Sequence, residues 1–239
     1  MDGADDLTTS LIKLTSLVSD HASLEETLFW IAYYCSVVVQ RSAGSVMTLA
    51  GGHRAAVVAS TQVARAAEAV HQSAGEGPSL TAIAERRAAV STSLGSDLCW
   101  PRFGAAVARM GLHSVLAVPL VVSDRVIGSL SLYASEKGAF DERTARNAEQ
   151  FARPAAVIAH NASVLRESRT QVAQLTEAMR SRSAVDQAIG ILRSRTGISA
   201  DSALARLRHV SNTENIKLVE VARRLVEVAA IRAARRQSP

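Results

Sequence analysis

Apolar residues change their spacing along the first part of the chain, and these changes outline its elements. Ser23–Glu26 reads SLEE, a capping-box pattern, and the apolar run Leu28–Val39 that follows it predicts a helix. Two short apolar runs flank Gly51 and Gly52, which predicts a β-hairpin. Helical spacing then returns over Thr61–Ala74. The chain therefore opens with a helix, a hairpin and a second helix.

The same kind of alternation continues as far as Asp141. A short helix is expected to begin at Pro78, because proline favours the first helical position. A second hairpin follows, with Ser123 and Asp124 as the polar turn between two apolar strands. Phe140 and Asp141 then begin another helix. This order predicts an α+β fold in which helices flank an antiparallel sheet, and not a parallel βαβ sheet.

A long helical pattern follows, from Asp141 almost without a break to Thr196. Apolar residues recur in it every seven positions, at Phe151, Ile158, Leu165, Val172 and Met179. Pro154 is expected to kink this helix or to restart it. The spacing favours a coiled coil, so we predict a connector helix at 164–182 that joins two copies as a parallel homodimer. A single helix packed on its own domain is the alternative.

The C-terminal part of the chain divides into three helical segments. Gly197 is expected to end the first segment, Ser199 to cap the start of the second, and Asn215 to cap the start of the third. Ala188 and Gly190 are small, and we expect them to let the helices approach closely. The pattern therefore predicts a three-helix unit after the connector.

Composition is that of a folded protein without a membrane span. The chain has 239 residues, of which 48% are hydrophobic, enough for a packed core. Its apolar runs, such as Val115–Val122, are far shorter than the ~20 residues that a membrane helix needs. The N-terminal sequence MDGADDLTT lacks the basic and apolar regions of a signal peptide. We therefore expect a cytoplasmic protein with no membrane partner.

Charge is distributed unevenly along the chain. Residues 1–164 contain 13 lysines and arginines against 15 aspartates and glutamates, a net charge of −2. Residues 165–239 contain 14 against 7, a net charge of +7. This asymmetry indicates an anionic partner for the C-terminal part. A solvated helical surface is the alternative.

The residues that could perform catalysis or hold a metal are not arranged in a motif. No nucleophile elbow, phosphate loop or metal-ligand spacing frames the serines, histidines and aspartates. His71 and His113 could ligate haem or a metal, but neither has a second ligand at a suitable spacing. We interpret both as ordinary core or surface histidines. The sequence thus predicts no catalytic residues, no metal site and no enzyme.

Two segments of the first part resemble GAF domains, which sense small molecules. They read EGPSLTAIAERRAAVSTSLGSDLCWPRF at Glu76–Phe103 and GLHSVLAVPLVVSDRVIGSLSLY at Gly111–Tyr133. The resemblance implies a sensor domain at 1–163 with a pocket between the sheet and its covering helices. It leaves the cofactor unknown, because GAF domains bind cyclic nucleotides, haem, tetrapyrroles, small metabolites or nothing.

Asp97, Trp100 and Arg102 lie together in the segment DLCWPRF. We consider them candidate ligand-binding residues at the rim of the implied pocket. A structural staple that fixes this loop is the alternative reading of the same three side chains.

The segment Ser183–Glu227, SAVDQAIGILRSRTGISADSALARLRHVSNTENIKLVEVARRLVE, resembles an ANTAR domain, the RNA-binding output module of transcription antitermination regulators. The matching positions are Ala188, Gly190, Gly197–Ser199, Ala203, Leu207, Ser211, Asn215, Lys217 and Ala222. The resemblance implies an ANTAR domain at 183–239 that binds hairpin loops in nascent RNA as a dimer and so prevents termination. Many members have lysine where this chain has Ile189, which removes one candidate phosphate contact.

Basic residues of the C-terminal part are the candidate RNA-binding residues. They are Arg180, Arg182, Arg193, Arg195, Arg206, Arg208, Lys217, Arg223 and Arg224. Arginine suits both phosphates and unpaired bases, and no aromatic residue follows Phe151, so arginine has to replace aromatic stacking. The alternative function is a signalling adaptor whose helical C-terminal unit docks a protein partner.

Overall fold

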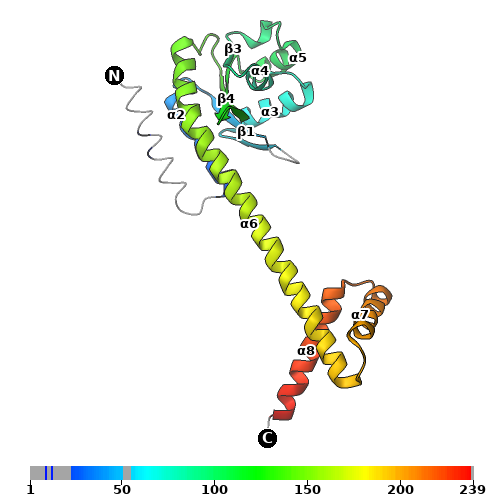
Figure 1. The fold of residues 1–239 in the computed structure, drawn as a ribbon. Coiled ribbons are helices and arrows are strands. Elements are labelled where there is room, and N and C mark those ends of the chain that lie inside the picture. The colour runs from blue at the N-terminus through cyan, green and yellow to red at the C-terminus, as the bar shows by residue number, and fades with distance from the viewer. Residues whose placement is uncertain (1–8, 10–11, 13–22, 51–54, 238–239) are drawn as a thin grey trace. The chain divides into compact units, whose positions relative to one another are not determined.

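The computed structural model describes residues 9, 12, 23–50 and 55–237, and its contacts divide the chain into two compact units. The sheet unit comprises Met1–Arg166, and the C-terminal unit comprises Glu167–Pro239. Figure 1 labels most of the helices and strands of the two units. Within the described ranges, no helix is long and apolar enough to cross a membrane.

A five-stranded antiparallel sheet forms the centre of the sheet unit. Its strands are β1 (Gly44–Leu49), β2 (Ala56–Ala59), β3 (Ala89–Ser91), β4 (Ser114–Val122) and β5 (Arg125–Ala134). They lie in the order β2-β1-β5-β4-β3, so the hairpins β1–β2 and β4–β5 meet along the β1–β5 pair. The α+β fold and both hairpins are therefore confirmed. Gly51 and Gly52, the expected turn of the first hairpin, lie outside the described residues.

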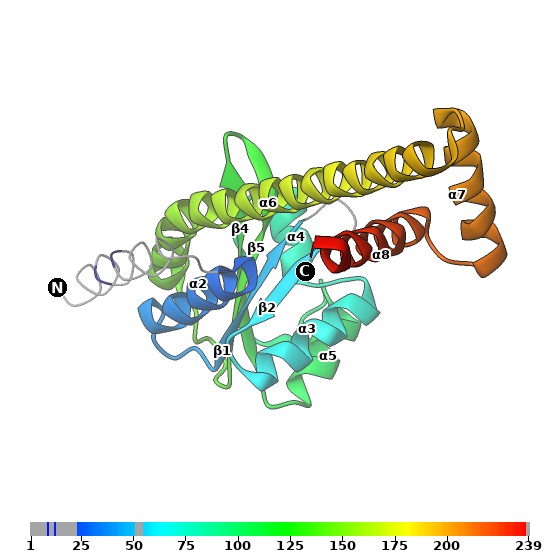
Figure 2. The same cartoon turned by 90° about the horizontal axis from the view of Figure 1, so that it is seen from below.

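Helices cover both faces of this sheet. One face is covered by α2 (Leu24–Val38) and the first part of α6 (Glu142–Thr196). The other face is covered by α3 (Gln62–Ala74), α4 (Pro78–Glu85) and α5 (Pro101–Ala108). Figure 2 shows the two helical layers with the strands between them.

Local sequence signals set the ends of several of these elements. The Ser23 hydroxyl accepts a hydrogen bond from the Glu26 amide at 3.2 Å, and the Glu26 carboxylate accepts one from the Ser23 amide at 2.7 Å. This is the predicted capping box, and it starts α2. Thr61 caps α3 with its side chain. Ser123 and Asp124 have φ angles of 45° and 63°, as a type I′ turn between two strands requires.

Each face of the sheet has its own hydrophobic core. The core beneath α2 and α6 contains Leu28, Leu130 and Phe151, which are fully buried. The core beneath α3, α4 and α5 is built around Phe103 and Tyr133. Buried polar side chains from α3 and β5 share this second core.

Two elements of the sheet unit were not expected from the hydrophobic pattern, namely β3 and α5. β3 is only three residues long, and it is held by its pairing with β4. α5 is eight residues long and follows a short 3₁₀ turn at Leu94–Ser96. Apolar periodicity is read over about 4–8 residues for a strand and about 11–18 for a helix, so elements this short are not revealed by local pattern alone.

The long helix α6 continues through Pro154 as one element. The expectation that the helix restarts at Pro154 was therefore wrong. Proline removes one backbone donor, but Ala152 and Ala155 on either side of it are buried in the core and hold the helix in place. Asp141 caps the first turn with its carboxylate, in agreement with the predicted start.

Two parts of α6 differ in how they use the seven-residue apolar repeat. Phe151 is fully buried, and Ile158 packs against the same core. Leu165, Val172 and Met179 are 49%, 60% and 74% exposed. Packing on its own domain therefore describes the first part of the helix, whereas the second part carries apolar side chains at the surface.

Three helices make up the C-terminal unit: the end of α6, α7 (Ala200–Glu214) and α8 (Leu218–Gln237). Gly197 follows α6 with a φ of 70°, and its amide donates to the backbone carbonyl four residues earlier at 2.9 Å. The Ser199 hydroxyl accepts a hydrogen bond from the amide three residues later at 3.2 Å, which caps α7. Both predicted helix ends are confirmed.

Asn215 has a different role from the one expected. It ends α7 in the left-handed conformation, with a φ of 53°, and its amide donates to the Ser211 carbonyl. The Ser211 hydroxyl donates to the Ile216 carbonyl at 2.6 Å and holds the same turn. The prediction that Asn215 caps the start of the third helix was wrong, because asparagine tolerates the left-handed region that this turn requires.

The core of the C-terminal unit is small. It consists of Ala188, Leu207, Val221 and Ala222, with partly buried side chains around them. Ala188 is fully buried, as expected for close approach of the helices. Gly190 does not share this role, because it is exposed and a Cβ added to it meets no atom within 4 Å. It lies two residues after Ala188, which places it on a different side of the helix.

Candidate functional site

All nine basic residues that were predicted to bind RNA lie at the surface of the C-terminal unit. Four lie on α6 (Arg180, Arg182, Arg193 and Arg195), two on α7 (Arg206 and Arg208), one between α7 and α8 (Lys217) and two on α8 (Arg223 and Arg224). The structure divides them by whether they already have an acidic partner.

Three of these basic residues form ion pairs within the unit. The contacts are Arg223 with Glu177 (2.7 Å) and Glu220 (3.3 Å), Arg224 with Glu214 (3.4 Å), and Arg182 with Asp186 (3.9 Å). The hydrogen bond and charge of Arg223 lower the pKa of the Glu177 carboxyl, and the same contact raises the pKa of Arg223. Arg223 therefore ties α8 to α6.

Five others have no acidic partner among the residues that the structure describes: Arg193, Arg195, Arg206, Arg208 and Lys217. The first two lie in the last turn of α6 before Gly197. Their charge is not neutralised by the protein, so it is available to an anion in solution. The ninth, Arg180, is in none of the ion pairs above, but its charge also contributes to the lowered pKa of Glu177.

Two adjoining grooves lie between α6 and α8, and Gln187 lines both. The first, of about 450 Å³, is lined by Arg180, Ser183, Ala184, Gln187, Arg223, Val226 and Glu227. The second, of about 400 Å³, is lined by Gln187, Gly190, Ile191, Ser194, Arg195 and Ala229. The exposed Gly190 thus forms part of a groove wall and not of a helix crossing.

In the sheet unit, Asp97 and Trp100 use their polar atoms to fix the chain before α5. The Asp97 carboxylate accepts a hydrogen bond from the Cys99 amide at 2.9 Å. The Trp100 ring is buried, and its Nε1–H donates to the Thr81 hydroxyl at 3.0 Å. The first contact stabilises the segment internally, and the second joins it to α4.

Arg102 belongs to a second set of contacts at the start of α5. The Glu76 carboxylate accepts hydrogen bonds from the Arg102 amide at 2.7 Å and the Phe103 amide at 3.1 Å, and it lies 3.3 Å from the Arg102 guanidinium. The bond from the Phe103 amide, together with the contacts of Arg102, lowers the pKa of Glu76. These are the contacts of a structural staple. Ligand binding by Asp97, Trp100 and Arg102 stays a prediction.

A cluster of buried polar side chains between α3 and the sheet was missed in the sequence. Glu68 and His71 lie one turn apart on α3 and are 4% and 7% exposed, with 3.4 Å between Oε1 and Nδ1. Ser129 and Tyr133, fully buried on β5, project to the same face of the sheet. A carboxylate and an imidazole three residues apart within Thr61–Ala74 were the signal that could have revealed this cluster.

A pocket of about 590 Å³ borders this cluster. It is lined by Thr48, Ala55, Val57, Glu68, His71, Gln72, Gly75 and Leu80. Glu68 is the acidic side chain in this lining, and among the described residues the lining contains neither lysine nor arginine. Apolar side chains supply most of the remaining wall. The pocket therefore combines a carboxylate with hydrocarbon surface.

Family models match both units of the chain. A GAF domain model matches residues 21–160, and an ANTAR domain model matches residues 173–226. The chain belongs to the GAF family and carries an ANTAR domain. It thus joins a sensor domain to a module of the kind that binds RNA in transcription antitermination. No curated protein sequence gives a significant match.

Solved structures resemble the GAF domain in fold. A protein described as a GAF sensor from Burkholderia vietnamiensis matches with a TM-score of 0.51 and 17% identity, over 68% of this chain and 98% of that one. A domain of a protein described as a two-component sensor histidine kinase from Sinorhizobium meliloti 1021 matches with a TM-score of 0.50 and 11% identity, over 62% and 99%. Identities this low show the fold alone.

An enzyme is also among the similar structures. The free methionine-R-sulfoxide reductase from Neisseria meningitidis has a TM-score of 0.49 and 16% identity, over 69% of this chain and 95% of that one. This likeness carries no conclusion about activity. In the part of the chain that the structure describes, no three His, Cys, Asp or Glu side chains are grouped to hold a metal ion.

In the ANTAR domain, Ile189 packs against the small core. An apolar side chain is thus used for packing at the position where many members have lysine. Ala203 and Leu207 are buried, and Ser211 and Asn215 hold the turn after α7. The residues that match the family pattern therefore mainly support the fold. The exposed arginines are the groups that remain available for contact with a ligand.

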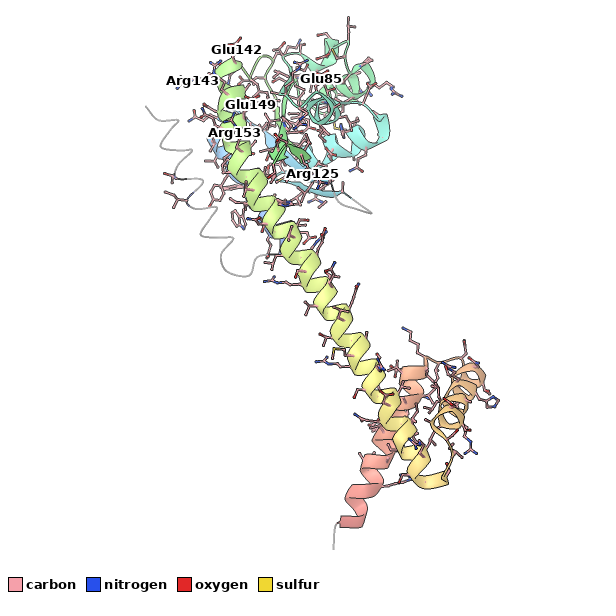
Figure 3. The ribbon with its side chains drawn as sticks, in the orientation of Figure 1. Glu85, Arg125, Glu142, Arg143, Glu149 and Arg153 are labelled. Atoms are coloured by element: carbon pink, nitrogen blue, oxygen red, sulfur yellow. The ribbon has the colours of Figure 1, made fainter. Side chains whose placement is uncertain are left out.

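The GAF domain has a second, smaller hollow of opposite charge. It measures about 210 Å³ and is lined by Arg86, Arg87, Pro119, Val121, Glu149 and Arg153. Figure 3 shows charged side chains from α4, β5 and α6 on this domain, including Glu85, Arg125, Glu149 and Arg153. The Arg86 guanidinium donates to the Asp124 carbonyl at 2.6 Å. At least one of its arginines thus supports the β4–β5 turn.

Proposed function

We propose that this protein is a cytoplasmic, signal-responsive regulator of transcription antitermination. The GAF domain receives the signal, and the ANTAR domain binds hairpin loops in nascent RNA and so prevents termination. No catalytic step is required of either domain. The helix α6 begins in the sheet unit and ends in the C-terminal unit, and it is the covalent connection through which one domain influences the other.

The observation that carries this proposal is the set of basic residues without acidic partners in an ANTAR domain. Arg193, Arg195, Arg206, Arg208 and Lys217 form no ion pair within the described residues, so they can exchange bound counterions for phosphates. The grooves edged by Arg180, Arg223 and Arg195 offer a place for a phosphate chain or an unpaired base. Arg182, Arg223 and Arg224 have acidic partners, and we assign them a weaker share of the binding.

We propose further that the protein acts as a homodimer through the exposed part of α6. Val172, Leu175 and Met179 are 60%, 66% and 74% exposed, and helical spacing places them on one side of the helix. Lone surface hydrophobics are ordinary, but a row of them at coiled-coil spacing is typical of a helix that pairs with another. A second copy brings a second ANTAR domain, which suits RNA with two hairpins in tandem.

Binding of the full-length protein to a tandem-hairpin RNA over a salt series tests the main proposal. A scrambled-loop RNA of equal length is the control ligand. We expect selective binding that weakens with salt, and a smaller salt dependence when Arg206→Ala and Arg208→Ala are combined, because each lost phosphate contact lowers the slope by about 0.7–0.9. The matched control is Arg65→Ala with Arg109→Ala, which removes the same charge from the exposed surface of the GAF domain.

Equal binding to both RNAs reduces the ANTAR domain to a general basic surface and contradicts the proposal. Binding of a protein partner together with indifference to hairpin RNA supports the adaptor function instead. Dimerisation is tested separately by sedimentation. Val172→Lys with Met179→Lys is expected to give monomers, whereas Gln171→Lys with Gln174→Lys adds the same charge to other exposed sides of α6 and leaves the dimer intact.

A further inference from the structure

We infer that the GAF domain binds a small molecule with a protonated amino group and a short hydrocarbon part, and that the carboxylate of Glu68 is its anchor. This inference rests on the proposed sensing function and specifies the chemistry of the signal. It concerns the pocket beside α3, and not the segment that contains Asp97, Trp100 and Arg102.

Glu68 is a buried carboxylate that forms no hydrogen bond with the described residue beside it, His71. Its Oε1 lies 3.4 Å from His71 Nδ1, whereas Oε2 has no hydrogen-bond partner among the described residues. The side chain is 4% exposed. Burying a carboxylate oxygen without a donor is unfavourable, and most buried polar atoms in proteins have a partner. A ligand that donates a hydrogen bond to Glu68 Oε2 would therefore stabilise an oxygen that the protein leaves unpaired.

The side chains around Glu68 are hydroxyls and an imidazole, and few of them are positively charged hydrogen-bond donors. Both ring nitrogens of His71, Ser129 Oγ and Tyr133 Oη also lack hydrogen-bond partners within the described part of the chain. Burial raises the pKa of the Tyr133 hydroxyl, and the nearby negative charge of Glu68 raises it further. The hydroxyl thus stays protonated and can donate or accept. A ligand with an ammonium group matches this set, because it brings both the missing donors and the missing positive charge.

The pocket gives such a ligand access to the cluster. Glu68 and His71 line its wall, and Thr48 lies beside Ser129 across the β1–β5 pair. Val57 and Leu80 supply apolar surface, and none of the described residues that line the pocket is a lysine or an arginine. Its volume of about 590 Å³ is within the range of small-molecule sites. The lining therefore favours a cation with a hydrocarbon part over a phosphate or a carboxylate.

The imidazole of the cluster packs closely against Gly77, where there is no room for a side chain. A Cβ at this position lies 2.3 Å from His71 Cδ2, and the φ of Gly77 is +151°, where other residues are strained. His71 also meets the Phe103 ring edge to face, with 5.9 Å between ring centroids. The imidazole next to Glu68 is thus confined on two sides.

Titration of the full-length protein with three matched probes tests the inference. The probes are butylammonium, 1-butanol and butyrate, which share a hydrocarbon chain and differ in the charge of the head group. NMR shifts of the histidine ring protons report binding at neutral pH. We expect butylammonium to bind with a millimolar Kd, as its size allows, at least tenfold tighter than butanol, and butyrate to give no shift of His71.

Two variants connect the result to Glu68. Glu68→Gln keeps the size of the side chain and is expected to weaken butylammonium binding at least tenfold. Glu68→Asp keeps the charge but withdraws it by one methylene, and an intermediate Kd is expected. Glu85→Gln, on the half-exposed end of α4 (Figure 3), removes the same charge elsewhere and is expected to leave binding unchanged.

Equal binding of butylammonium and butanol, or a Glu68→Gln variant that binds butylammonium as the parent does, overturns the inference. Tryptophan fluorescence shows whether the variants are folded, because Trp30 and Trp100 both lie in the GAF domain. RNA binding is measured in parallel without any probe. If the parent protein binds RNA but not butylammonium, this inference alone is refuted. If it binds butylammonium but not RNA, the proposed function alone is refuted.

Discussion

The two units of this chain differ most in how much hydrophobic surface they bury. The GAF domain has a core on each face of its sheet, with Leu28, Phe103 and Phe151 among its fully buried side chains. In the C-terminal unit, the buried hydrophobic residues within the described ranges are Ala188, Ala203, Leu207, Val221 and Ala222. Burial of alanine contributes little because the gain scales with apolar area. The C-terminal unit is therefore the weaker of the two.

This difference explains where each unit places its polar groups. A large core can include the buried carboxylate of Glu68 and the hydroxyl of Tyr133 and still fold, since many apolar contacts offset their cost. A small core has too few apolar contacts to offset the cost of burying polar groups. The C-terminal unit accordingly keeps its arginines at the surface, and it gains from ion pairs such as Arg223 with Glu177.

The largest effect that would sharpen this comparison comes from two substitutions on α6 itself. Phe151→Ala is expected to lower the free energy of unfolding of the GAF domain by about 3–5 kcal/mol, because it opens a cavity in a well-packed core. Val164→Ala, at a side chain on the later part of α6 that is 50% exposed, is expected to change it by less than about 0.5 kcal/mol. Urea unfolding followed by tryptophan fluorescence measures both. If both variants lowered the free energy of unfolding by a similar amount, the two halves of α6 would not differ in how they are packed.

A somewhat smaller effect is expected in the C-terminal unit. Leu207→Ala removes the one leucine in its buried cluster, and we expect a loss of about 2–3 kcal/mol, because a small core partly collapses onto the vacated space. Hydrogen exchange should become faster in α7 and α8 and stay unchanged in the sheet. Val228→Ala, at a side chain that is 43% exposed, is the control. If exchange in the sheet rises as well, the two units are not independent.

Sequence pattern predicted the parts of the fold that local chemistry determines. The capping box at Ser23, the turn at Ser123 and Asp124, and the helix end at Gly197 each depend on residues within four positions of one another. β3 depends on pairing with a distant strand, and it was missed. Asn215 was placed at the correct boundary but in the wrong helix, because asparagine suits both a helix start and a left-handed helix end.

Site residues were harder to predict than elements, for a similar reason. Composition and the ANTAR resemblance indicated which arginines lie on the C-terminal unit. They could not show that Arg223 is paired with Glu177, 46 positions earlier, while Arg195 has no acidic partner in the described residues. Glu68 and His71 are recognisable as a pair only once α3 is known to face the sheet. Burial by tertiary packing turns an ordinary acid into a candidate ligand anchor.

Helix caps provide a finer comparison of the two units. Ser23→Ala in α2 and Ser199→Ala in α7 each remove a hydrogen bond to an N-terminal amide, which costs about 1 kcal/mol. The same loss should shift the unfolding midpoint of the GAF domain modestly but increase hydrogen exchange throughout the first turn of α7, because the C-terminal unit has less stability to lose. Ser168→Ala, at an exposed position within α6, is the control. An equal response of both units would show that their stabilities are similar.

The smallest effect expected is a dependence of the C-terminal unit on acid pH. The pKa of Glu177 in the folded state is lowered by Arg223, so its contribution is present above the unfolded pKa of 4.5 and is lost as the pH falls through the lower folded value. Below that pH, the carboxyl is protonated and its ion pair with Arg223 is lost. Thermal unfolding by circular dichroism from about pH 6 to pH 3 should therefore show less loss for Glu177→Gln than for the parent. Glu167→Gln, at another exposed position on α6, is expected to behave like the parent. If Glu177→Gln loses as much stability in acid as the parent does, the effect comes from other carboxylates. The ion pair between Glu177 on α6 and Arg223 on α8 would then contribute no measurable stability.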